Sequence, residues 1–267
     1  MIGIPISITS KRKQTTKDCI LGVNNNANSQ LIFVDTPGIE LINKKFDRNR
    51  KLNSLATSIF DQVDLILWVI EAKKFTFDDK KISHLLPSKK PIIVAINKID
   101  LATNAVEKNK IFEQIHLFSN VKYSAIVPIS IHKTYQISQL IKEIENNLPI
   151  QSKIYDSNFL TDKSLTFRAC EIIREKTLRL VGDELPYKIN VHMDRFIEKN
   201  VNQKYYLLDV SIIVTKPSHK PIIIGKKANT IKRIRIDSQR SLVKLFSSDV
   251  RLSLWVKIRN KYLTNLE

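Results

Sequence analysis

Two short polar motifs each directly follow a run of apolar residues, and this arrangement constrains the fold more than any other feature of the chain. The first motif, Asp35-Thr36-Pro37-Gly38, follows residues 31–34, and the second, Asn97-Lys98-Ile99-Asp100, follows residues 92–96. Such apolar runs are typical of strands that are buried on both faces of a parallel sheet. Open α/β sheets bind ligands at the carboxyl ends of their strands, so both motifs are expected at a ligand-binding edge.

The first 150 residues alternate between apolar runs and amphipathic stretches. Strands are predicted near 31–34, 63–70, 92–96 and 125–129, and helices near 50–62, 75–86, 105–118 and 136–147. This alternation predicts a doubly wound α/β domain with a mostly parallel sheet. Residues 63–70 are nearly all apolar, so that strand is expected to be buried on both faces.

Residues 151–267 have a different pattern, which predicts a second domain of the α+β class. A helix is expected over 165–180, alternating strands over 187–197 and 205–215, a basic helix that ends near residue 246, and a last strand over 250–258. Two domains suit a chain of 267 residues, because single domains commonly hold roughly 100–200 residues.

The second motif carries the side chains that select a guanine base. The Asp100 carboxylate can accept hydrogen bonds from both the ring N–H and the exocyclic amine of guanine, a pair of donors that adenine does not offer. Asn97 and Lys98 are expected to brace the base and the neighbouring loops. Ser130 fits a third guanine-side element, in which Ile131 stands where a small alanine is usual.

The first motif suits the phosphates and the metal of a magnesium nucleotide. Asp35 at a strand end would hold Mg²⁺ through water, because magnesium keeps several of its waters. The Gly38 backbone can approach a terminal phosphate closely, since glycine has no side chain. Asp-x-Pro-Gly alone is also common in ordinary β-turns. The two motifs together, in this order along the chain, indicate a guanine-nucleotide site.

The phosphate-binding loop that normally precedes such motifs does not occur in the chain. The five glycines (Gly3, Gly22, Gly38, Gly182 and Gly225) include no two at the spacing of G-x-x-x-x-G-K-[ST]. That loop carries most phosphate binding, so nucleotide affinity is expected to be very weak. Two explanations stay open: a start assigned too late, which omits roughly 25 residues and which we favour, or genuine loss of the loop.

The formal net charge of +18 predicts an anionic partner, either nucleic acid or an anionic membrane surface. A codon bias toward Lys, Ile and Asn is the other explanation. Cys19 and Cys170 lie far apart, which favours a reducing cytosol. No apolar run approaches the roughly 18 residues of a membrane span, and the N-terminus has no signal-peptide pattern.

The motifs resemble those of the bacterial Era GTPase family, and the resemblance covers nearly the whole chain. The second-domain segments that carry it are Phe159–Asp162, Glu171–Lys176, Glu184–Tyr187, Ile222–Lys227 and Leu254–Lys257. GTPases in general do not share these segments. The resemblance implies a Ras-like GTPase domain over 1–150, with its first strand missing, and a type II KH domain over 151–267.

The resemblance also implies a function. The family binds GTP and GDP with Mg²⁺, hydrolyses GTP slowly, binds the 3′ end of small-subunit ribosomal RNA and acts in assembly of the small ribosomal subunit. A cytoplasmic monomer is implied, and some members associate peripherally with the inner membrane. The nucleotide-binding positions would be residues 35–39, 97–100 and 130, with Thr16 and Asp35 at the metal. Ile39 stands where Ras-like proteins have a water-positioning glutamine.

The RNA-binding clamp of the KH domain would be Gly225-Lys226-Lys227-Ala228, with Lys232 and Arg233 beyond it. The family has a second glycine at the position of Ala228, where the backbone approaches nucleic acid at a helix start. The methyl group is small and helical torsion angles are expected, so RNA binding should be weakened rather than lost. The basic charge between residues 216 and 240 predicts a salt-dependent affinity.

Two competing hypotheses remain. The chain could be a non-hydrolysing RNA-binding assembly factor whose GTPase half is a relic. A weaker alternative is a protein that its basic charge holds at a membrane surface.

Overall fold

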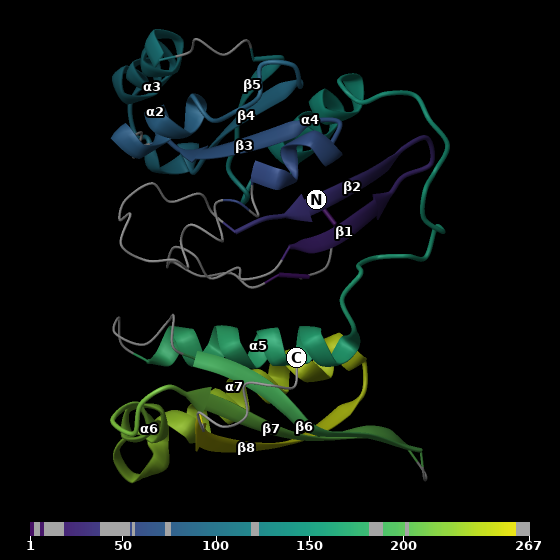
Figure 1. Ribbon diagram of the computed structural model, residues 1–267, viewed down its shortest axis with the longest axis vertical. Coiled ribbons are helices and arrows are strands. Elements are labelled where there is room, and N and C mark those ends of the chain that lie inside the picture. Colours follow the sequence, from purple (N-terminus) through teal and green to yellow (C-terminus); the bar gives the residue numbers. More distant parts are fainter. Residues whose placement is uncertain are drawn as a thin grey trace. The chain divides into compact units, whose positions relative to one another are not determined.

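The computed structural model describes residues 1–2, 6–7, 19–37, 54, 57–72, 76–118, 123–181, 189–200 and 203–259. It contains two compact units, and the chain passes from the first to the second between Leu160 and Thr161 (Figure 1). Among the residues described, no helix has the length and apolar character needed to cross a lipid bilayer.

The first unit is built on a three-stranded parallel sheet with the strand order β3-β4-β5. The strands are β3 (Ile66–Glu71), β4 (Ile92–Asn97) and β5 (Ala125–Pro128). Glu71 pairs with Asn97 across β3 and β4, and Ile96 pairs with Pro128 across β4 and β5. The carboxyl ends of the three strands therefore meet at one edge, as the sequence predicts.

A separate antiparallel pair, β1 (Ile20–Asn25) and β2 (Gln30–Asp35), belongs to the same unit. β1 was not predicted, because its sequence Ile-Leu-Gly-Val-Asn-Asn combines a short apolar run with residues that are depleted in strands. Leu31 and Phe33 of β2 pack in one cluster with Ile93 and Leu140. In the described part of the chain, β2 and β3 each pair on one edge only.

The helical elements described for the first unit are η1 (Phe60–Gln62), α2 (Phe77–Ser83), η2 (Ile99–Leu101), α3 (Ala105–Phe118) and α4 (Thr134–Asn146). α2 begins with a capping box between Thr76 and Asp79, which satisfies backbone donors at the helix start. Of the helix predicted over 50–62, residues 54 and 57–62 are described; residues 54, 57 and 58 are helical, and Phe60–Gln62 form η1.

The prediction that the strand near 63–70 is buried on both faces is wrong at one position. Ile66, Trp68 and Ile70 are buried against the cluster that includes Phe112 of α3. Val69 points to the opposite face and is 54% exposed. Burial of Val69 would require another element packed over that face of β3, and none of the described residues forms such an element there.

Residues 153–160 hydrogen-bond to the β1–β2 hairpin of the first unit. The Gln30 side-chain oxygen accepts from the backbone N–H groups of Ile154 (2.8 Å) and Tyr155 (2.9 Å). The backbone N–H of Val23 donates to the Leu160 carbonyl at 2.9 Å. These bonds explain why the first unit extends to Leu160.

The second unit has the α+β architecture that the sequence predicts. Its elements are α5 (Leu165–Leu180), β6 (Ile189–Asn200), β7 (Lys204–Val214), α6 (His219–Ile224), η4 (Lys226–Ala228), α7 (Asn229–Phe246) and β8 (Asp249–Ile258). β6 and β7 are antiparallel, and β7 and β8 are parallel. The core lies between this sheet and the helices α5 and α7, where Ile173 and Ile234 are fully buried.

Candidate functional site

The loop after β4 is held in a tight, left-handed turn at the carboxyl edge of the parallel sheet. Lys98 has φ 63° and ψ 34°, and its backbone N–H donates to the Asn97 side-chain oxygen at 2.8 Å. The Lys98 ammonium lies 2.9 Å from a carboxylate oxygen of Glu71, the last residue of β3. The loop is thus tied to both strands that flank it.

The structure brings Asp100 and Ser130 together, as their predicted roles require. The Ser130 hydroxyl donates a hydrogen bond to the Asp100 carboxylate, which lowers the pKa of Asp100, and the positive charges of His132 and Lys133 act in the same direction. The backbone N–H of Ile99 also donates to the Ile129 carbonyl at 3.3 Å. Asp100 is therefore an ionised, solvent-accessible acceptor beside the loop after β5.

Two residues that sequence reasoning missed support this arrangement. Glu71 fixes Lys98, and Gln136 on α4 accepts a hydrogen bond from the buried backbone N–H of Ser130 at 2.6 Å. Gln136 lies one and two turns before the buried Leu140 and Ile144 on the same helix face. A polar residue on the apolar face of a helix is the signal that could have identified it, because buried polar groups need partners.

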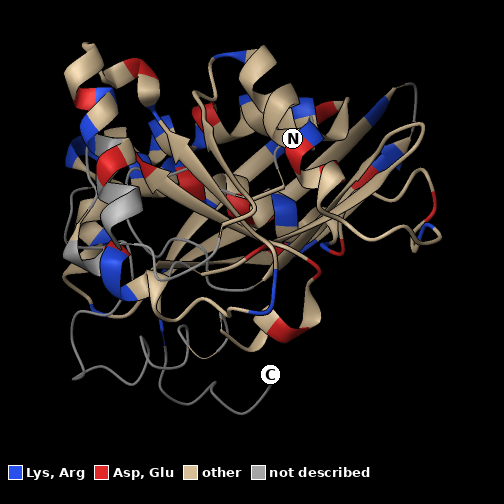
Figure 2. Cartoon of the chain, turned by 90° about the horizontal axis from the view of Figure 1, so that it is seen from above, with Lys and Arg blue, Asp and Glu red and all other residues tan. Residues whose placement is uncertain are grey.

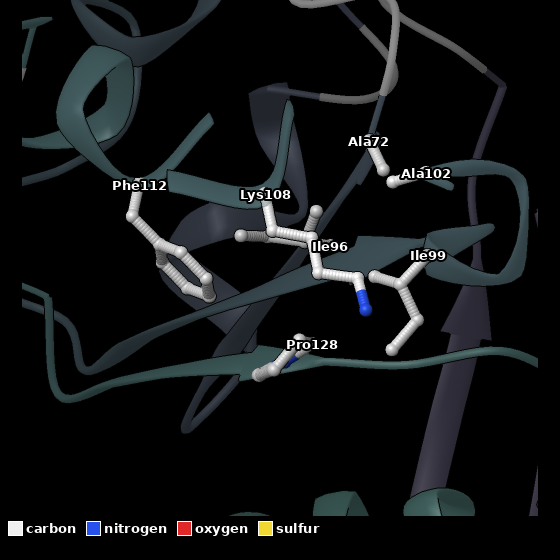
Figure 3. Close-up of a pocket in the computed structure, with 7 residues that line it drawn as sticks. All are labelled: Ala72, Ile96, Ile99, Ala102, Lys108, Phe112 and Pro128. Atoms are coloured by element: carbon white, nitrogen blue, oxygen red, sulfur yellow. The ribbon is translucent and has the colours of Figure 1, made fainter. Parts of the chain in front are cut away.

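An apolar cavity of about 130 Å³ lies behind the Asn97–Asp100 loop (Figure 3). Ile96, Ile99 and Pro128 line it from the sheet side, and Lys108 and Phe112 line it from α3. Lys108 supplies the one charged group of this lining. Because the lining is almost entirely apolar, the cavity does not have the character of a phosphate site.

Asp35 ends β2, where its Cα pairs with that of Ile20, and Thr36 and the buried Pro37 follow. Gly38, Ile39 and Thr16 lie outside the described residues. Within the described ranges, no three His, Cys, Asp or Glu side chains form a group that could hold a metal ion. A magnesium ion would therefore need the nucleotide phosphates and water as ligands in addition to Asp35.

We expect replacement of Ser130 by alanine to weaken guanine binding. As the pH falls, the variant should also lose guanine binding at a higher pH than the unmodified chain does. The Asp100 carboxylate accepts guanine donors only when ionised, and its lowered pKa keeps it ionised to unusually low pH. Binding should therefore be lost as the pH falls through the pKa of Asp100, and Ser130→Ala should raise that pH. At neutral pH the loss of one hydrogen bond predicts about a threefold to tenfold weaker affinity.

Titration of GDP binding against pH measures this effect, with circular dichroism to exclude acid unfolding. Ser138→Ala is the matched control, because Ser138 bonds only to the Thr134 carbonyl of its own helix in the described contacts. Identical pH profiles for the Ser130 and Ser138 variants would contradict the role assigned to Ser130.

The second candidate site is the turn between α6 and α7. Gly225 has φ 74° and ψ 170°, and a Cβ there would lie 2.9 Å from the backbone nitrogen of Thr230 and closer still to its side chain. Only glycine therefore fits this position without strain. Lys226 and Lys227 follow it and are both exposed.

The expectation that Ala228 has helical torsion angles is wrong. Ala228 has φ 60° and ψ 22°, and Lys227 has φ 49° and ψ 33°, so both are left-handed. This conformation costs roughly 1–2 kcal/mol for a residue with a Cβ. The turn thus keeps a backbone shape that suits glycine, and α7 begins after it at Asn229.

Basic side chains extend from this turn along α7. Lys232 and Arg233 are exposed on its first turns, and Arg233 lies 3.9 Å from Asp237, the one acid between residues 216 and 240. Figure 2 marks the lysines and arginines in blue. The other members of this group are Lys216, Lys220, Arg235 and Arg240. The turn and α7 together present positive charge of the kind that contacts phosphates.

Comparisons with known proteins agree with both halves of this description. Residues 1–98 match the family described as 50S ribosome-binding GTPase, and residues 184–263 match the KH domain family. GTPase Era of Bordetella avium is 35% identical over 260 residues, which cover 97% of this chain and 86% of that protein. The chain belongs to the Era GTPase family. GTPase Era of Yersinia enterocolitica is 34% identical, with 97% of this chain and 84% of that protein covered.

Solved Era structures share the fold. One is Era in complex with MgGDPNP and nucleotides 1506–1542 of 16S ribosomal RNA, with 33% identity and a TM-score of 0.88 over 96% of this chain and 86% of that one. Another is a variant of Aquifex aeolicus Era bound to GDP·AlF4⁻, with 32% identity and a TM-score of 0.86 at the same coverage. The predicted order of a Ras-like GTPase fold followed by a KH domain is confirmed.

Proposed function

We propose that this chain binds guanine nucleotide and small-subunit ribosomal RNA, and that it assists assembly of the small ribosomal subunit. The observation that carries the nucleotide half is the contact between Ser130 and the ionised Asp100 at the strand edge. Asp100 and Ser130 meet from two separate loops, one after β4 and the other after β5. Membership in the Era family supports the RNA half.

The nucleotide would be GTP or GDP with Mg²⁺. Asp100 would accept the guanine donors, with Asn97, Lys98, Ile99 and Ser130 around the base. The segment from Asp35 to Ile39 would face the phosphates, and Asp35 and Thr16 would complete the shell of the ion. We propose that any hydrolysis of GTP is slow, because Ile39 stands where Ras-like proteins have a water-positioning glutamine.

The RNA would bind at the turn from Gly225 to Ala228 and at Lys232 and Arg233. The exposed side chains of Lys226 and Lys227 in this turn support the role, because lysine side chains contact phosphates. We further propose that residues 1–150 act as the nucleotide domain and that the RNA domain lies within residues 151–267, of which 153–160 bond to the first unit. The protein would be a cytoplasmic monomer with peripheral association at the inner membrane.

A second function has one specific observation in its favour. Ile131 stands beside Ser130 where a small alanine is usual, and this departure favours a non-hydrolysing RNA-binding assembly factor with a relic nucleotide half. In that case Asp100→Asn and Asp35→Ala would leave RNA binding unchanged, and only changes such as Lys226→Glu with Lys227→Glu would weaken it.

Fluorescence anisotropy with labelled RNA tests the proposed function. The full chain should bind a 3′-terminal small-subunit rRNA fragment at least about tenfold more tightly than a scrambled fragment of equal length, because base contacts add to the charge term. Equal affinity for both fragments would mean binding by charge alone and would contradict the proposal.

A further inference from the structure

One face of the β6-β7-β8 sheet is covered by helices, and the opposite face carries an exposed aromatic and basic stripe. On β8, Val250 and Leu252 belong to the core. Because strand residues alternate between faces, Arg251, Ser253, Trp255 and Lys257 lie on the opposite face. Figure 1 shows α5 and α7 on the core side, and no helix described for this unit covers the other side.

Trp255 is the most conspicuous member of this face. It is 57% exposed, whereas Trp68, the other tryptophan of the chain, is 8% exposed. An indole that packs in the core of its own domain would be buried, so Trp255 does not serve the core. Its ring is available to stack on a planar group.

A second planar group lies on the same face. The Arg251 guanidinium lies 5.0 Å from the ring centroid of Tyr205 on β7. Arg251 and Trp255 are four residues apart on one strand, hence about 13 Å apart along it. Two stacking groups in a row on an edge strand suit an extended ligand with several planar rings.

The charges on the face suit a polyanion that binds mainly by stacking. Lys257 lies 3.2 Å from both carboxylate oxygens of Asp194, and Arg195 lies 2.6 Å from Asp209. Within the strands β6, β7 and β8 as described, the face has four cations and three carboxylates: Arg195, Lys199, Arg251 and Lys257 against Asp194, Asp209 and Asp249. The net charge of the face is therefore only slightly positive. This charge is too small to bind the face to a lipid surface, but it does not repel phosphates.

We propose that this open sheet face, formed by Tyr205, Arg251, Trp255 and Lys257, binds single-stranded RNA by base stacking. Aromatic platforms beside basic groups are a general means of binding single strands, and they tolerate different sequences. The face would extend the RNA contact beyond the Gly225–Ala228 turn. This inference rests on the proposed RNA-binding function.

Tryptophan fluorescence of the full chain tests the inference directly. Trp68→Phe leaves Trp255 as the sole tryptophan, and titration with an oligouridylate of about ten nucleotides should quench its emission. Trp255→Phe leaves only the buried Trp68 and should show no quenching. In anisotropy, Trp255→Ala should weaken binding of the same RNA by about 5- to 100-fold, and Trp255→Phe should retain most of the affinity because phenylalanine still stacks.

The controls separate this inference from the proposed function. If Trp255→Ala binds RNA as tightly as the unmodified chain while Lys226→Glu with Lys227→Glu does not, the open-face site is wrong and the proposed function stands. If the unmodified chain binds no RNA, both are wrong. Emission changes of the Trp68→Phe variant with phosphatidylglycerol vesicles, but not with RNA, would assign the face to a membrane and overturn the inference.

Discussion

Simultaneous replacement of Lys226 and Lys227 by glutamate is expected to weaken RNA binding by about 100-fold at low salt. Both side chains are exposed in a turn whose backbone is left-handed at Lys227 and Ala228. Each lysine that neutralises a phosphate releases counterions from the RNA, and two reversed charges remove that gain and add repulsion. The slope of log affinity against log salt should fall by about 1.5.

Anisotropy titrations at several salt concentrations measure both effects. Lys89→Glu with Lys110→Glu is the matched control, because it makes the same change of net charge at exposed positions of the first unit. The RNA affinity of the control should fall only a few-fold, because its two mutations change only the long-range electrostatic potential of the protein. Equal losses in the two variants would show that net charge, rather than the turn, determines RNA affinity.

Replacement of Asp100 by asparagine is expected to weaken guanine binding by about 100-fold. The ionised carboxylate offers two acceptors, whereas asparagine offers one acceptor and one donor. The donor would face the exocyclic amine of guanine, so the variant loses one charge-assisted hydrogen bond and gains a clash of donors. Xanthine has an oxygen in place of that amine, so the variant should prefer xanthosine diphosphate to GDP.

Ligand-observed NMR suits the weak affinities expected for this chain. GDP and xanthosine diphosphate would be titrated against the unmodified chain and against Asp100→Asn, with Asp61→Asn on the exposed η1 turn as the control. A variant that binds both nucleotides as the unmodified chain does would exclude Asp100 from base recognition.

The second unit could be predicted closely from the sequence, because its strands alternate strongly and its helices have clear ends. α5, for example, begins where Ser164 accepts a hydrogen bond from the Phe167 backbone N–H. The six-residue helix α6 received no prediction, since Pro221 and three consecutive isoleucines obscure so short a helix. The first unit was less predictable, because β1 has little strand character of its own and pairs only through the turn to β2.

The candidate site could be predicted where its residues lie in short motifs that directly follow predicted strands. Asp100 and Ser130 could be placed together because each follows one of two adjacent parallel strands. Gln136 and Glu71 could not, since their roles depend on how α4 and β3 pack beside those loops. The left-handed Ala228 was also beyond prediction, because alanine by itself favours the right-handed helical region.

Competition among GDP, guanosine and ADP for the full chain tests the central claim most directly. If the loop around Asn97, Asp100 and Ser130 recognises the base, GDP and guanosine should both bind, and each should displace the other. ADP should not compete at concentrations at which GDP saturates. Equal competition by ADP, or no binding of either guanine ligand, would contradict the account.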